Sequence, residues 1–107
     1  NRLTEFNAIQ RSTAAIMATN DARAKTSVAA VPFQGNVYLY YADSSDNLRR
    51  ATRANGQWGT SAMVRDSPPV GNGQITVTAA NGLNHVLYLA RDDSMAQRGF
   101  THVYDRI

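Results

Sequence analysis

The sequence predicts an all-β fold built from two related antiparallel units, and two observations support this prediction. Between residues 27 and 107, short runs rich in valine, threonine and tyrosine alternate with clusters of glycine, asparagine and aspartate. The order of strand, polar turn and strand occurs twice, and Leu39-Tyr40 and Leu87-Tyr88 stand 48 residues apart. The chain contains no cysteine, which excludes disulfides, thiolate zinc sites and cysteine nucleophiles.

Four strands are predicted in the first unit, separated by residues typical of turns. The turns lie at Gln34-Gly35-Asn36, at 43–47 and at Asn55-Gly56, and the last is among the strongest two-residue hairpin signals. One strand alternates apolar or small residues with arginine, as a half-buried strand does. The four strands are SVAAVPF (27–33), NVYLYYAD (36–43), LRRATRA (48–54) and QWGTSAMV (57–64).

The second unit repeats this order after a connector. Residues 65–73, RDSPPVGNG, contain paired prolines and glycines that cannot continue a strand ladder. A turn at 81–84 then separates the next two strands. The three predicted strands are QITVTAA (74–80), HVLYLARDDS (85–94) and FTHVYDRI (100–107).

Residues 1–26 permit two interpretations. Apolar residues fall at roughly helical spacing and Thr4 is able to cap a helix start. STAAIMAT (12–19) instead resembles a short buried strand, which would supply the missing fourth strand of the second unit. We therefore treat 1–26 as a segment that is either a helix or a blade-closing strand, and 27–107 as one domain with units 27–66 and 74–107.

The strand count predicts a propeller-type arrangement of two four-stranded blades. Residues 37–41 are apolar or aromatic on both faces, as expected of a strand between two neighbouring blades. Two blades cannot close a ring. We therefore expect a homo-oligomer, in which three copies complete a six-bladed β-propeller, or a place within a longer protein. A single small β-sandwich, or a sheet with a helix, is the simpler alternative.

The charge pattern argues against two classes of partner. The net charge is +3, and the arginines are interspersed with acidic residues instead of forming a run. A nucleic-acid-binding domain usually has a concentrated basic face, and no apolar run approaches the roughly 18 residues of a membrane helix. We expect neither nucleic acid nor a membrane as partner. The compartment stays open.

Aromatic and arginine side chains are the candidate ligand-binding groups. Aromatic rings stack on apolar faces such as those of sugars, and a guanidinium donates paired hydrogen bonds to hydroxyls and carboxylates. Strand alternation places Arg49 and Arg53 on one face and Arg50 on the other. Core packing for the tyrosines and a solvated strand edge for the arginines are the competing explanations. The candidate residues are Tyr38, Tyr40, Arg49, Arg50, Trp58 and Arg91.

No sequence pattern indicates catalysis or a metal centre. A nucleophile elbow, a phosphate-binding loop and an H-E-x-x-H helix are absent, and Glu5 is the only glutamate. His85 and His102 are the only histidines, and two histidines without a third ligand are weak evidence for zinc. Turn chemistry explains the acidic clusters at 43–47 and 91–93 better than a calcium loop does. We therefore expect no catalytic residue, no metal and no cofactor.

The first unit combines an apolar-tyrosine run, a polar turn and a tryptophan after an Asn-Gly turn, at Leu39-Tyr40-Tyr41, Asp43, Asn47, Leu48-Arg49 and Trp58-Gly59. The second unit keeps the apolar pair with tyrosine and the polar turn, but it has no tryptophan. In these features residues 27–107 resemble the blade repeat of the fucose-specific lectins of fungi and bacteria. The resemblance implies a sugar-binding propeller with ligand sites between adjacent blades, formed in some members by trimers of two-blade chains.

The chain departs from that family at the groups that clamp fucose. The family places an arginine ahead of the apolar pair, where this chain has Tyr38 and Val86. It places a glutamate where this chain has Arg50, and a guanidinium donates hydrogen bonds but cannot accept them. The resemblance therefore favours a glycan without specifying fucose.

These observations predict non-catalytic, lectin-like binding of a glycan or another small ligand in pockets between β-blades. Two alternatives stay open. One is an enzyme that uses the same propeller scaffold on a small hydrophobic metabolite, and the other is a structural or protein-interaction module.

Overall fold

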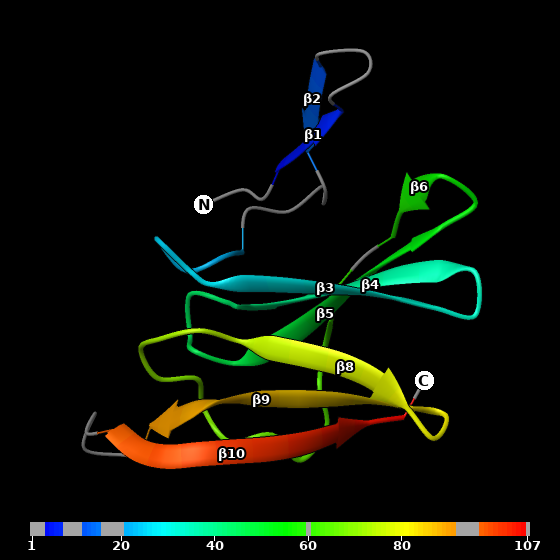
Figure 1. The fold of residues 1–107 in the computed structure, drawn as a ribbon. Coiled ribbons are helices and arrows are strands. Elements are labelled where there is room, and N and C mark those ends of the chain that lie inside the picture. The colour runs from blue at the N-terminus through cyan, green and yellow to red at the C-terminus, as the bar shows by residue number, and fades with distance from the viewer. Residues whose placement is uncertain (1–3, 8–11, 16–20, 60, 92–96, 107) are drawn as a thin grey trace.

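The computed structural model describes residues 4–7, 12–15, 21–59, 61–91 and 97–106. In these residues the chain forms ten β-strands and no helix, so the all-β prediction is confirmed (Figure 1). The described part accordingly has no helix with the length and apolar character needed to cross a membrane.

The strands form three antiparallel sheets. A small hairpin pairs β1 (Thr4–Asn7) with β2 (Ser12–Ala15). The first sheet has the order β3 (Val28–Phe33), β4 (Asn36–Ala42), β5 (Leu48–Ala54) and β6 (Gln57–Trp58), and β7 (Ala62–Met63) also pairs with β5. The second sheet has the order β8 (Thr76–Ala80), β9 (Leu83–Arg91) and β10 (Gln97–Asp105).

Two-residue turns join β3 to β4, β5 to β6 and β8 to β9. Both residues of each turn, Gln34-Gly35, Asn55-Gly56 and Asn81-Gly82, have positive φ. This is the backbone of a type I′ turn, whose twist matches that of the flanking strands. The predicted turns at these positions are therefore confirmed. Asparagine and glycine adopt a positive φ readily, which explains why they mark such turns in the sequence.

Strand β4 is buried on both faces. Tyr38, Tyr40 and Ala42 point toward the second sheet, whereas Leu39 and Tyr41 point the opposite way. The side chains of Tyr40 and Tyr41 have no exposed surface. Because consecutive side chains of a strand alternate between faces, this strand needs apolar groups at every position, as its sequence provides.

The main core lies between the two sheets. Val86, Tyr88 and Ala90 of β9 and Val103 of β10 pack against the face of β4 that carries Tyr40. Figure 1 shows the second sheet stacked on the first, and β8 lies close to β3. Each fully buried side chain of this size contributes roughly 1.5–3 kcal/mol, so this interface is a main source of stability.

The opposite face of the first sheet is covered from within the chain. Ala22 packs against Leu39, Tyr41 and Ala51, and the partly buried Trp58 completes this second cluster. The Tyr41 hydroxyl donates to the Asp21 carboxylate at 2.9 Å. Burial, reinforced by that carboxylate, raises the pKa of Tyr41 well above its usual range, so the hydroxyl stays a donor.

The N-terminal segment is not helical where it is described. Residues 4–7 and 12–15 are strands, and Thr4 pairs with Ala15. Strand β2 therefore pairs with β1 and adds nothing to the second sheet, which has three described strands instead of the expected four. The rest of residues 1–20 lies outside the described part.

The predicted strand at 57–64 is interrupted. Trp58 pairs with Arg53, but Ala62 pairs with Arg50, so the register shifts by one residue between β6 and β7. Such a shift is the mark of a β-bulge, which bends the strand that carries the extra residue. Both short segments nevertheless pair with β5, as a fourth strand would.

The turns of two hairpins, Gln34-Gly35 between β3 and β4 and Asn81-Gly82 between β8 and β9, lie 47 residues apart, whereas the matched Leu-Tyr pairs lie 48 apart. When the two hairpins are aligned on their turns, Tyr41 matches Tyr88, whereas the sequence match paired Tyr40 with Tyr88. Both β4 and β9 carry a Leu-Tyr pair, so that pair alone does not define the register.

Candidate functional site

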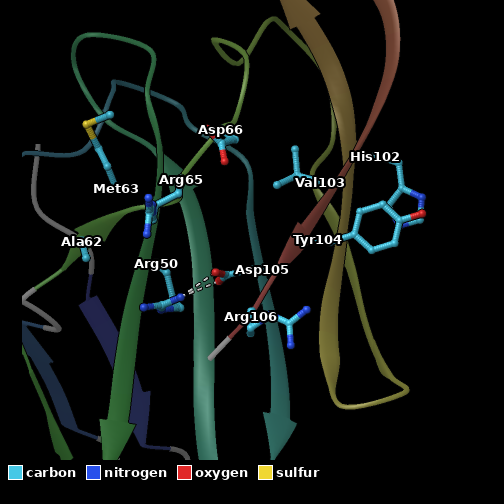
Figure 2. A pocket seen from close by; sticks show the side chains of 10 residues that line it. All are labelled: Arg50, Ala62, Met63, Arg65, Asp66, His102, Val103, Tyr104, Asp105 and Arg106. Atoms are coloured by element: carbon cyan, nitrogen blue, oxygen red, sulfur yellow. Dashed lines mark hydrogen bonds and ion pairs between the residues drawn. The ribbon is translucent and has the colours of Figure 1, made fainter.

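An open pocket of about 810 Å³ lies where the outer strands of the two sheets meet (Figure 2). Arg50 of β5, the short strand β7 and Arg65-Asp66 form its first wall, and residues 102–106 of β10 and its end form the second. Three arginines and two aspartates are among the ten lining residues. The pocket therefore combines charged with apolar side chains and carries a small excess of positive charge.

Arg50 and Asp105 form an ion pair across the pocket from opposite walls (Figure 2). The Nη1 atom of Arg50 lies 2.7 Å from each carboxylate oxygen of Asp105. The Arg50 side chain is 23% exposed and that of Asp105 is 7% exposed. Burial alone would lower the pKa of Arg50, but the hydrogen bond and the charge of Asp105 raise it overall.

Tyr40 binds the Asp105 carboxylate from the core side, and Asn84 in turn binds the Tyr40 hydroxyl. The Tyr40 hydroxyl donates to Oδ2 of Asp105 at 2.6 Å and accepts from Nδ2 of Asn84 at 2.9 Å. Burial, together with the Asp105 carboxylate, raises the pKa of Tyr40 far above its usual range. The phenol therefore stays protonated as a donor, and the carboxylate is fixed by an arginine on one side and a tyrosine on the other.

Arg65, Asp66 and Arg106 provide exposed charges at the rim of this pocket. Met63 is 54% exposed and gives the first wall an apolar surface. A ligand that reaches Arg50 would pass these side chains. The guanidinium groups of Arg65 and Arg106 remain charged hydrogen-bond donors at all physiological pH values.

The aromatic rings of β10 lie on the other side of its sheet. Figure 2 shows His102 and Tyr104 pointing away from Arg50, while Asp105 points toward it. Val103, between the two rings in sequence, belongs to the core. This follows from strand alternation, so His102 and Tyr104 belong to the wall of the pocket but their rings point away from Arg50.

Two of the six sequence-predicted residues, Tyr40 and Arg50, meet through Asp105 beside the pocket. Tyr38 is a buried core residue whose ring centroid is 6.3 Å from that of Phe33. The core packing that the sequence offered as an alternative thus accounts for its position. Whether these residues contact a ligand stays a prediction.

The other three predicted residues lie away from the pocket. Arg49 points to the opposite face of β5, as predicted from strand alternation, and its Nε donates to Asp43 at 2.8 Å. Trp58 packs on the second cluster on that same face. Arg91 pairs with Asp46, which also accepts from Arg23. The structure therefore does not gather the six residues into one site.

Asp105 and the rim charges were not among the predicted residues. Asp105 had a detectable signal, because the alternation of its strand puts it on the same face as buried Val103. A carboxylate at an inward position needs a partner. The rim residues Arg65, Asp66 and Arg106 carried no such signal, since exposed charges are ordinary in connectors and at chain ends.

Comparison with family models, with curated proteins and with solved structures finds no match to this chain.

Proposed function

We propose that this protein is a non-catalytic, lectin-like binding protein that holds a glycan or another small hydroxyl-rich ligand in the pocket between its two sheets. The observation that supports this proposal is the Arg50–Asp105 pair at 2.7 Å on the wall of an open pocket. Arginine donates and aspartate accepts hydrogen bonds. Adjacent hydroxyls of a sugar, each of which can donate and accept, suit such a pair.

The fixation of Asp105 favours binding over proton transfer. Its carboxylate already accepts from Arg50 and from Tyr40. A catalytic base must reach a proton of its substrate, and both oxygens of this carboxylate already accept hydrogen bonds within the protein. A rigid acceptor is more useful for recognition, because little conformational entropy is lost when the ligand binds.

We further propose that the two sheets are propeller-type blades and that copies of the chain associate, three of them giving six blades. With the two hairpins aligned on their turns, Leu87 and Leu89 of β9 occupy the positions of Tyr40 and Ala42 of β4. The face of β4 is covered by the second sheet, whereas Leu87 is exposed. A further sheet, supplied by another copy, would cover this open face in the same way.

The binding proposal is tested on an array of neutral, sialylated, sulfated and uronic-acid glycans. The variant Arg50→Lys keeps the charge but loses the paired donors of the fork, so we expect at least about a tenfold loss of affinity for any glycan bound. The matched control is Arg49→Lys, because Arg49 lies next to Arg50 on β5 but points to the opposite face. Binding by Arg50→Lys at wild-type strength, with unchanged unfolding, would contradict the proposal.

A further inference from the structure

The two histidines of the chain meet on the open face of the second sheet, although 16 residues lie between them in sequence. Nδ1 of His85 lies 3.0 Å from Nε2 of His102. His85 pairs with Tyr104 and His102 with Leu87 in the register of β9 and β10, so the two rings are diagonal neighbours on one face. Their centroids are 5.1 Å apart.

The hydrogen bond made by Nε2 of His85 determines which nitrogen of this ring carries the proton. Nε2 of His85 lies 3.1 Å from the carbonyl oxygen of Ala80. Because a carbonyl only accepts, Nε2 carries the proton and Nδ1 presents a lone pair toward His102. A histidine that donates its other ring N–H to a backbone carbonyl is the usual arrangement of a metal-ligating histidine.

The spacing of the two nitrogens fits a shared metal ion. Metal–nitrogen bonds of about 2.0–2.1 Å at a tetrahedral angle separate two imidazole nitrogens by about 3.3–3.4 Å. The distance between the two nitrogens is 3.0 Å. It would have to lengthen by only a few tenths of an ångström for a metal ion to take the place of the proton between the two rings.

Tyr104 limits the movement of both imidazoles. Its ring stacks on His102 at a centroid distance of 4.3 Å and an interplanar angle of 18°. It also meets His85 at 5.2 Å with a tilted, edge-on geometry. Two pre-oriented ligands cost less conformational entropy on binding than two mobile ones.

We propose that His85 Nδ1 and His102 Nε2 form an open, two-histidine site for a divalent transition metal ion. The described residues contain no group of three or more histidines and carboxylates, so water or an external ligand would complete the coordination. Imidazole ligands select Cu²⁺, Ni²⁺ and Zn²⁺ over Mg²⁺ and Ca²⁺. The proposed metal site does not use the Arg50–Asp105 pair, because the His102 side chain points away from Arg50 (Figure 2).

The test is a titration of the untagged protein, as purified, with Zn²⁺, followed by calorimetry and by ¹⁵N NMR of the imidazole nitrogens. Because the chain has two histidines, the spectrum assigns the ligands directly. We expect one Zn²⁺ per chain, with shifts at His85 Nδ1 and His102 Nε2, and no response to Mg²⁺. Absence of Zn²⁺ binding, or shifts at other ring nitrogens, would overturn the proposal.

Variants provide an independent measurement. His85→Gln and His102→Gln should each weaken Zn²⁺ binding at least about tenfold, whereas Gln57→Ala, an exposed change on β6 of the first sheet, should leave the affinity unchanged. Cu²⁺ electron paramagnetic resonance should show two coupled imidazole nitrogens in the wild type and one in each single histidine variant. A His85→Gln/His102→Gln double variant that binds Zn²⁺ as the wild type does would place the metal elsewhere.

Discussion

At the scale of single residues, the hydroxyl of Tyr40 links the two sheets. It connects the fully buried Asn84 to the Asp105 carboxylate, and Asp105 in turn meets Arg50. Among the described atoms, Oδ1 of Asn84 is buried without a hydrogen-bond partner. The amide is therefore held through its nitrogen, and the loss of the phenol oxygen would leave both Asn84 and Asp105 short of a partner.

Tyr40→Phe should consequently destabilise the protein by about 1–3 kcal/mol, the cost of leaving buried polar groups unsatisfied. Urea unfolding followed by circular dichroism measures this change. Tyr104→Phe is the matched control, because Tyr104 is 60% exposed and its substitution should change stability by less than about 0.5 kcal/mol. Equal stabilities for the two variants would show that the Tyr40 hydroxyl contributes nothing.

At the scale of elements, the connection between β4 and β5 is organised by one carboxylate. Oδ1 of Asp43 accepts from the backbone N–H groups of Ser45 and Asn47, and Oδ2 accepts from Nε of Arg49. Burial would raise the pKa of Asp43, but these hydrogen bonds lower it overall. The turn therefore depends on the ionised form of Asp43, as well as on the conformational preference of its residues.

This dependence predicts how stability changes in acid. Because the pKa of Asp43 is lower in the folded than in the unfolded state, its contribution is complete above the unfolded value of about 3.9. It is lost as the pH falls through the folded pKa. Asp43→Asn should lower stability at pH 7 and should flatten the loss of stability below about pH 4, measured by urea unfolding across that range. A variant whose acid profile parallels the wild type would contradict this assignment.

At the scale of the whole molecule, the two outer faces of the stacked sheets differ. The face of the first sheet that carries Tyr41 is covered within the chain. The open face of the second sheet exposes Phe100 (78%), Tyr104 (60%) and Leu87 (37%). Large apolar side chains that are exposed on one face of a sheet are candidates for an interaction surface, which is the basis for the proposed association of copies.

Phe100→Asp should therefore shift the protein toward the monomer, because it places a charge in the proposed contact. Light scattering coupled to size-exclusion chromatography measures the mass, with a wild-type mass about three times that of one chain expected. Asn55→Asp, which adds the same charge at the tip of the β5–β6 turn, should keep the wild-type mass. A wild type that is monomeric at every concentration tested would remove the trimer and the ring.

The sequence predicted local structure better than the meeting of distant residues. The Asn-Gly turns and the alternation in β5 depend on neighbouring residues, so their positions and faces were predictable. The 57–64 strand was not, since its one-residue shift appears only when the pairing with β5 is known. Two contacts were not predictable from local patterns, because their residues are distant in sequence. They are the contact of Arg50 with Asp105 between the sheets and that of His85 with His102 between neighbouring strands.

The burial of the tyrosines has a consequence for chemical modification. Of the five tyrosines, Tyr104 is the exposed one. The other four are buried: Tyr38, Tyr40, Tyr41 and Tyr88. A nitrating or iodinating reagent should thus label the single chain at one ring, the one that stacks on His102, and association of copies over this face should reduce that labelling. That single label would sit beside the paired imidazoles and on the uncovered sheet, where a spectroscopic reporter could sense both metal uptake and contact with another chain.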